Sequence, residues 1–190
     1  MKKIALVCLM LSMRFIAPAQ SIIHCLIKTE LGNIAIELYP DKAPITVANF
    51  LYYVDNNLYK GSTFFRVCTP ENEAKRPVKI EVIQGGSVDT TKYAPPIKIE
   101  TTKQTGLRHE DGTLSMARSG PNTATSQFFI CINDQPALDY GGARNPDGYG
   151  FAAFGKVTKG MDVVRKIQAQ KEHAQYLIER VKIEDIVRVK

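Results

Sequence analysis

The segment from Gly112 to Cys131, with the sequence GTLSMARSGPNTATSQFFIC, constrains the fold more than any other part of the chain. Two apolar runs typical of β-strands flank a polar loop that contains Gly120, Pro121 and Asn122. Glycine, proline and asparagine between β-prone runs indicate a turn. The segment therefore predicts two strands separated by a polar loop.

Similar short strand patterns and two helical patterns occupy the rest of the chain. Alternating apolar residues predict a β-hairpin over residues 24–38, and Pro44 opens a helix whose apolar residues recur at helical spacing. Further strands are expected at 63–67, 78–84, 113–118, 126–132, 151–157 and 181–189, and a second helix at Met161–Gln170. This order favours a mainly β fold, a closed or nearly closed antiparallel barrel, over a doubly wound α/β sheet.

Two charged segments carry no clear strand or helix pattern. Residues 69–77 combine prolines with charges and predict a surface loop. Residues 171–180 mix charges with apolar side chains and are expected to pack against the barrel. No linker or repeat divides the chain, and 190 residues with 44% apolar content suffice for one core. A single domain over residues 20–190 is expected.

The N-terminus has the pattern of a secretory signal peptide. Lys2 and Lys3 precede an apolar run, and Ala17-Pro18-Ala19 offers small residues at cleavage-site spacing. The apolar run is about ten residues long, short of the ~20 that a membrane span needs. Residues 1–19 are therefore expected to be removed, which predicts an exported, periplasmic or secreted protein with no stable membrane insertion.

Composition argues against several classes of partner and cofactor. Cleavage would remove three bases and no acid, lowering the formal charge from +6 to +3, and no Lys/Arg stripe remains, so nucleic-acid binding is not expected. The three cysteines outside the leader, Cys25, Cys68 and Cys131, lie beside strand patterns and are expected to be buried thiols. The scattered histidines and the lack of nucleotide-binding glycine motifs predict no metal and no cofactor. A monomer is expected.

Several motifs together resemble the cyclophilin-type peptidyl-prolyl cis-trans isomerases, bacterial exported members in particular. The motifs are GTLSMARSGPNTATSQFFIC, FFR at 64–66, VIQGG at 82–86 and FGKVTKGMDVV at 154–164. They stand in the family's order at roughly its spacing, so the resemblance covers most of residues 26–190. It implies an eight-stranded barrel capped by two helices and isomerase activity on proline-containing polypeptides. Compared with typical members of the family, which join the flanking strands by only a few residues, residues 69–77 resemble an insertion.

The chemistry of prolyl isomerisation explains which residues matter. Amide resonance gives the bond a barrier of ~20 kcal/mol, so a catalyst must hold the proline in an apolar pocket and present a cationic donor to its nitrogen. A guanidinium suits this because it is always charged. The resemblance implies Arg66 and Gln84 as catalytic residues. It implies the following substrate-binding residues: Val82, Ala117, Arg118, Gln127, Phe129, Leu138 and Phe151.

Some positions depart from the family pattern. The pocket's usual Phe-Met pair is replaced by Glu81-Val82, and Ala137 stands where the family has Trp or Phe. Strand alternation places Val82 on the face of Gln84 and Glu81 on the other. Tyr140 or Tyr149, in the glycine-rich loop 140–150, is a candidate for the missing aromatic wall.

These departures leave alternatives to an isomerase of exported proteins. One is a non-catalytic module that binds proline-containing segments or acts as a chaperone, with a remodelled pocket. Another is a structural role in which the insertion over residues 69–77 docks a partner.

Overall fold

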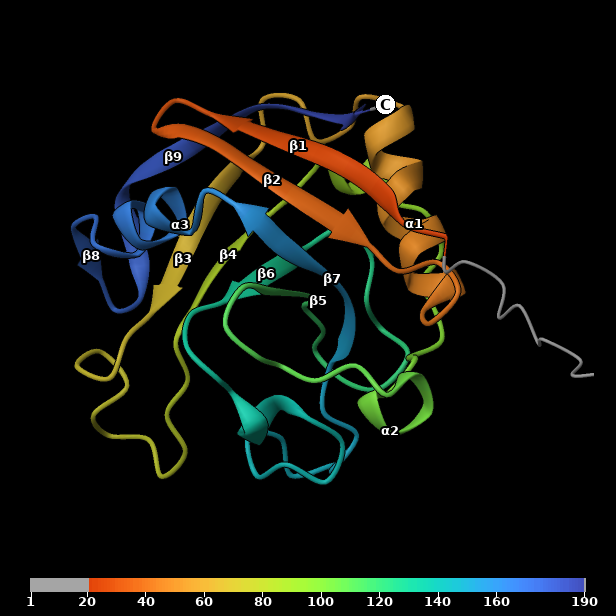
Figure 1. Ribbon diagram of the computed structural model, residues 1–190. Helices are drawn as coiled ribbons and strands as arrows, with labels where there is room; N and C mark the ends of the chain where they lie inside the picture. The colour runs from red at the N-terminus through yellow and green to blue at the C-terminus, as the bar shows by residue number, and fades with distance from the viewer. Residues whose placement is uncertain (1–20, 190) are drawn as a thin grey trace, which may run out of the picture.

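An antiparallel β-barrel forms the body of the protein in the computed structural model, which describes residues 21–189 (Figure 1). The predicted signal peptide, residues 1–19, lies outside the described residues. The barrel strands are β1 (Ile23–Thr29), β2 (Gly32–Leu38), β3 (Thr63–Cys68), β4 (Val82–Gly85), β5 (Thr113–Met116), β6 (Phe128–Cys131), β7 (Ala152–Lys159) and β9 (Tyr176–Val189).

The barrel closes because its last strand returns to its first. The order around it is β1-β2-β7-β5-β6-β4-β3-β9, all neighbours are antiparallel, and β9 pairs again with β1. Each of these strands therefore has a partner on both sides, which removes the open edges of a sheet. The ninth strand, β8 (Glu172–His173), pairs only with β9. The predicted closed eight-stranded antiparallel barrel is confirmed.

Helices pack on opposite sides of the barrel (Figure 1). Helix α1 (Pro44–Asp55) begins with a proline, whose missing N–H costs nothing in a first turn. Helix α3 (Met161–Gln168) buries Val163, Val164 and Ile167. Both helices agree with the sequence prediction, whereas the one-turn helix α2 (Thr102–Thr105) lies in a stretch that carries no helical pattern. Two 3-10 turns, Thr90–Lys92 and Pro136–Leu138, complete the connections.

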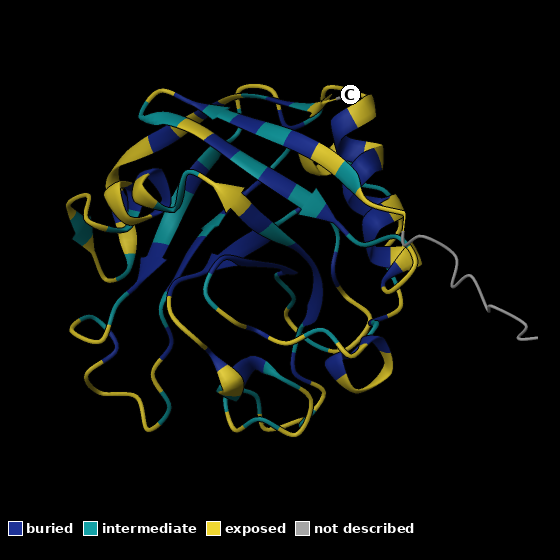
Figure 2. Cartoon of the chain, in the orientation of Figure 1, coloured by how far each residue is buried: buried dark blue, intermediate teal, exposed yellow. Residues whose placement is uncertain are grey.

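Strand alternation divides the apolar side chains into two clusters. In β1 and β2 every second residue is buried, as expected for strands with one face on a core (Figure 2). The main core contains an aromatic group centred on Phe50, Tyr59 and Phe128, whose rings lie 5.3–5.5 Å apart. A second, outer cluster contains Cys68, Ile80, Val82, Phe129, Cys131 and Leu138. Neighbouring residues on β6 therefore belong to different clusters: Phe128 lies in the main core and Phe129 lies in the outer cluster.

Two predicted boundaries are wrong. The strand expected at 78–84 begins only at Val82, because the N–H of Ile80 donates to the Glu73 carboxylate rather than to a strand. The strand expected at 181–189 begins at Tyr176, and β8 pairs with its first residues. The segment 171–180 therefore joins the barrel as a β-hairpin, and its Leu177 is buried in the main core, in agreement with the expected packing against the barrel.

The three cysteine thiols among residues 21–189 are buried and unpaired. Cys25, Cys68 and Cys131 are free and at most 1% exposed. Burial raises the pKa of Cys25 and of Cys68 to about 11. The prediction of buried thiols is confirmed. Within residues 21–189, no helix is both long enough and apolar enough to cross a bilayer.

Gly86→Ala should destabilise the barrel strongly. Gly86 has φ +76°, and an added Cβ would lie 2.7 Å from the Phe128 ring and 2.9 Å from the Tyr59 ring. Overpacking together with backbone strain should lower the free energy of unfolding by about 2–4 kcal/mol in urea titrations. Gly61→Ala is the matched control, since Gly61 has φ +80° but open space around it. Equal losses in both variants would contradict this packing argument.

Candidate active site

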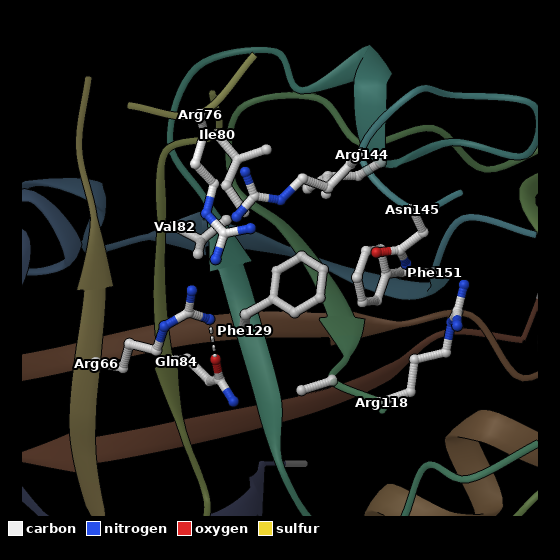
Figure 3. Close-up of a pocket in the computed structure, with 12 residues that line it drawn as sticks. Arg66, Arg76, Ile80, Val82, Gln84, Arg118, Phe129, Arg144, Asn145 and Phe151 are labelled. Atoms are coloured by element: carbon white, nitrogen blue, oxygen red, sulfur yellow. Dashed lines mark hydrogen bonds between the residues drawn. The ribbon is translucent and has the colours of Figure 1, made fainter. Parts of the chain in front are cut away.

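Three neighbouring strands place Arg66, Gln84 and Phe129 side by side. Arg66 of β3 is the register partner of Gln84 of β4, which in turn is the partner of Phe129 of β6. Residues in register on adjacent strands project to the same face. Arg66 Nη1 accordingly donates to Gln84 Oε1 at 2.9 Å (Figure 3).

A cavity of about 230 Å³ lies over this face. Twelve residues line it: Arg66, Arg76, Ile80, Val82, Gln84, Ala117, Arg118, Phe129, Leu138, Arg144, Asn145 and Phe151. Eight of the nine residues named from the sequence are among them. The ninth, Gln127, accepts a hydrogen bond from Gln84 Nε2 at 2.9 Å and lines an adjoining groove with Ala117 and Arg118. The structure thus brings all nine together.

Apolar side chains form the floor of the cavity. Phe129 is 4% exposed and Leu138 is fully buried. Phe151 meets the Phe129 ring edge-on at a centroid distance of 5.3 Å. These contacts hold Phe129 in one orientation under the open side of the cavity, where an apolar ring of a ligand finds a matching surface.

A buried histidine supports the floor from behind. His109 stacks on Phe129 at 6.0 Å, and its ring nitrogens contact Asp139 Oδ1 at 2.7 Å and Ser115 Oγ at 2.9 Å. Both ring nitrogens of His109 therefore have a hydrogen-bond partner. Among residues 21–189, no three His, Cys, Asp or Glu side chains lie close enough to hold a metal ion.

Glutamine oxygens hold the Arg66 guanidinium from two sides. Besides its bond to Gln84, Arg66 donates to Gln175 Oε1 from Nε at 3.0 Å and from Nη2 at 2.6 Å. Gln175 lies in the β8–β9 turn, where it has φ +74° and Ala174 has φ +51°. Within the described part of the chain, no carboxylate lies within 4.0 Å of this guanidinium. Its charge is therefore held by dipoles and is not neutralised by an ion pair.

Glu73 anchors this arrangement from the segment 69–77. Its side chain is fully buried, and its carboxylate accepts from Arg144 Nη2 at 2.7 Å, Gln175 Nε2 at 2.9 Å and the Ile80 N–H at 3.1 Å. Burial alone would raise the pKa of Glu73, but the hydrogen bonds and the charge of Arg144 outweigh it and hold the pKa below its usual value. The prediction of a charged surface loop is wrong for this residue.

Arg118 is fixed on the opposite rim of the cavity. It pairs with both Asp147 oxygens at 2.8 and 2.9 Å, donates from Nε to the Gly150 carbonyl at 2.8 Å, and lies 5.0 Å over the Phe151 ring. The glycine-rich loop 140–150 therefore supplies the counter-charge that holds Arg118 in place.

Of the residues that depart from the family pattern, some line the cavity and others lie outside it. Val82 lines the cavity, whereas Glu81 accepts from Asn133 at 3.1 Å and does not line it, as strand alternation predicts. Ala137 does not line the cavity either. The aromatic-wall hypothesis is wrong, because Tyr140 and Tyr149 are each 45% exposed and pack on each other outside the cavity.

Residues absent from the sequence prediction complete the site. They are Glu73, Arg76, Ile80, Arg144, Asn145 and Gln175. The backbone N–H of Arg144 donates to the Ala137 carbonyl, which brings the loop against the cavity. No local pattern in the sequence marks these residues, because they come from two irregular loops and one turn. Only the charges of residues 69–77 could have drawn attention to one of these segments.

Comparisons with known proteins agree with this geometry. Residues 24–188 match the family described as cyclophilin type peptidyl-prolyl cis-trans isomerase/CLD. A peptidyl-prolyl cis-trans isomerase of Acinetobacter baylyi is 48% identical over 145 residues, which cover 74% of this chain and 69% of that protein. Peptidyl-prolyl cis-trans isomerase A of Dickeya dadantii is 42% identical over 156 residues, with 79% and 74% covered. The crystal structure of a Cryptosporidium parvum cyclophilin type isomerase superposes with a TM-score of 0.69 at 26% identity, covering 90% of this chain and 99% of that one.

Glu73→Gln should destabilise the fold in a pH-dependent way. Because folding lowers the pKa of Glu73 from its ordinary 4.5, its stabilisation is complete above about pH 4.5 and is lost as the pH falls through the lower folded value. Near neutral pH the variant, which leaves Arg144 buried without its partner, should lose about 2–4 kcal/mol in urea unfolding. The gap to wild type should narrow towards pH 3. A gap that stays constant from pH 7 to pH 3 would rule out the ion pair as its source.

Proposed function

Because the chain belongs to the cyclophilin-type peptidyl-prolyl cis-trans isomerases, enzymes that act on proline-containing peptides, we propose that it isomerises Xaa-Pro bonds of exported polypeptides in the cavity around Arg66 and Phe129. The observation that carries this assignment is the Arg66 guanidinium. It faces an apolar floor and is held by two neutral glutamine side chains.

Arg66 would act on the prolyl nitrogen. Rotation about the peptide bond breaks amide resonance and localises a lone pair on that nitrogen, which then becomes a hydrogen-bond acceptor. A guanidinium N–H interacts more strongly with this lone pair than with the planar amide, so it stabilises the twisted state selectively. An ion pair with a carboxylate would weaken this interaction. The neutral side chains of Gln84 and Gln175 hold the guanidinium without neutralising its charge.

The floor would hold the proline ring while the bond turns. Phe129, Leu138, Val82 and Phe151 offer an apolar surface that excludes water from around the reacting nitrogen. Electrostatic interactions strengthen where water is excluded, which increases the effect of Arg66. Val82 is smaller than the methionine usual in the family at this position and would leave this part of the pocket shallower.

Gln84 and Gln127 would orient the substrate. Gln84 accepts from Arg66 through Oε1 and donates to Gln127 through Nε2, so its amide orientation is fixed by both neighbours. A fixed amide presents a defined dipole to the substrate carbonyl at no cost of reorganisation during the reaction. Ala117 and Arg118, which line the adjoining groove, would meet the peptide backbone.

The site's own geometry argues against the alternative of a non-catalytic binding module. Glu81, the residue that would most disturb a dry pocket, does not line the cavity. The segment 69–77 contributes Glu73 to the site instead of standing apart as a docking element. We further propose a single-domain monomer that uses no cofactor and binds no nucleic acid.

Arg66→Ala should reduce kcat/KM for an Xaa-Pro peptide by roughly 10²-fold, the size of one electrostatic donor's contribution. A protease-coupled assay or NMR exchange measures the rate. Arg165→Ala is the matched control, because Arg165 lies on helix α3 with an exposed ion pair to Asp111. Activity retained in Arg66→Ala would sink the catalytic assignment.

Gln175→Asn should lower kcat more than it raises KM. The shorter amide tolerates the positive φ of this turn but does not reach Arg66, so the guanidinium loses two hydrogen bonds and its orientation. Hydrogen bonds to charged groups contribute about 1.5–3 kcal/mol each, so a loss of roughly ten- to hundredfold is expected. Gln170→Asn, an exposed change on the same side chain type, serves as control. A pure KM effect would show that Gln175 does not position Arg66.

Export can be tested on the full chain expressed in a Gram-negative host. The signal pattern over residues 1–19 should direct the protein out of the cytoplasm, and N-terminal sequencing of the exported form should begin at Gln20. A product that stays in the cytoplasm with its N-terminus intact would contradict the export proposal and leave the isomerase assignment untouched.

A further inference from the structure

Four arginines line the cavity, and none of its twelve described lining residues is acidic. The arginines come from four different segments: Arg66 from β3, Arg76 from the loop after it, Arg118 after β5, and Arg144 from the loop 140–150. In Figure 3 the guanidinium groups of Arg66, Arg76 and Arg144 lie around the Phe129 ring. A pocket that only held an apolar proline ring would not need such a concentration of positive charge.

Two carboxylates behind the cavity wall neutralise only part of this charge. Glu73 is engaged by Arg144, with an oxygen 2.7 Å from Nη2, and Asp147 is engaged by Arg118 at 2.8 Å. Arg76 reaches Glu73 only at 3.5 Å, an oxygen that Arg144 and Gln175 already use. Among residues 21–189 the Arg66 guanidinium has glutamine partners alone, so Arg66 and Arg76 leave the cavity with an excess of positive charge.

Arg76 is the arginine best placed to meet a ligand. Its side chain is 58% exposed, whereas the side chains of Arg118 and Arg144 are 3% and 9% exposed and fixed by their ion pairs. It lines both the cavity and the adjoining groove that contains Gln175 and Tyr176. An arginine with unused donors at a pocket rim binds carboxylate or phosphate oxygens in a bidentate manner.

We propose that the cavity selects substrates carrying an anionic group, a carboxylate or a phosphate, on a residue adjacent to the proline, and that Arg76 is the residue that determines this specificity. The inference rests on the proposed function, since it names the substrate class of the same site. Part of the anion's water is displaced by the cavity wall, so its attraction to Arg76 and Arg144 is stronger than that of a fully exposed pair. The anion leaves the proline ring free to lie on Phe129.

Matched peptide pairs test the proposal, each with an anionic group in one member and a neutral group at the same position in the other. Ala-Pro-Asp against Ala-Pro-Asn and Asp-Pro-Ala against Asn-Pro-Ala place a carboxylate after or before the proline, and phosphoserine-Pro against Ser-Pro tests a phosphate. NMR exchange gives kcat/KM for each without a coupling protease. We expect at least one anionic peptide to exceed its neutral partner by about three- to tenfold, and the ratio to fall with added salt.

Two loop variants assign the preference to its residue. Arg76→Gln should bring the anionic-to-neutral ratio close to one. Lys75→Gln removes the same charge from the neighbouring exposed position, which does not line the cavity, and should keep the wild-type ratio.

The outcomes separate this proposal from the proposed function. Equal rates for all three pairs, with activity that still depends on Arg66, would overturn the anion preference alone. An equal fall of the ratio in Lys75→Gln and Arg76→Gln would overturn the role of Arg76. If none of the six peptides is isomerised, the proposed function fails, and NMR titration of the same pairs then compares their affinities and decides the anion preference independently.

Discussion

The hydrogen bonds between the Arg66 guanidinium and two glutamine oxygens are the interaction on which the rest of the site depends. Gln84 and Gln175 hold the cation in place without neutralising it. The buried carboxylate of Glu73 is connected to Arg66 through the Gln175 side chain, which donates to Glu73 and accepts from Arg66. Arg144 takes up the charge of Glu73. The site therefore keeps a fixed cation facing an apolar floor.

The closed barrel makes this arrangement possible through simple alternation. Phe128 enters the core, so Phe129 must face outward, and the register across β3, β4 and β6 then aligns Arg66 and Gln84 beside it. Closure through the β1–β9 pairing fixes that register, since a one-residue slip would turn every side chain to the other face. The core and the site are consequently two faces of the same strands.

The family resemblance predicted nine residues of the site, five of them outside the strands, and missed the residues that the segments 69–80 and 140–150 and the β8–β9 turn contribute. The resemblance implied Arg66, Gln84 and Phe129, and strand alternation placed Glu81 away from the face that carries Gln84. Gln175 and Glu73 could not be predicted, because their contacts with the site span about a hundred residues or join two irregular segments. Charge and proline content made 69–77 resemble a solvated loop, although tertiary contacts bury Glu73. The assignment of Tyr140 or Tyr149 to the cavity wall failed for the same reason, because the spacing of residues in a loop does not determine the direction in which the loop runs.

Replacement of Arg66 by citrulline in a semisynthetic protein is the measurement that tests the central claim most directly. Citrulline keeps the length and planarity of the side chain but replaces the cationic guanidinium with a neutral ureido group. If the uncompensated charge stabilises the twisted peptide bond, kcat/KM measured by NMR exchange should fall by roughly 10²-fold while the fold stays intact. Catalysis at the wild-type rate in the citrulline protein would contradict the account.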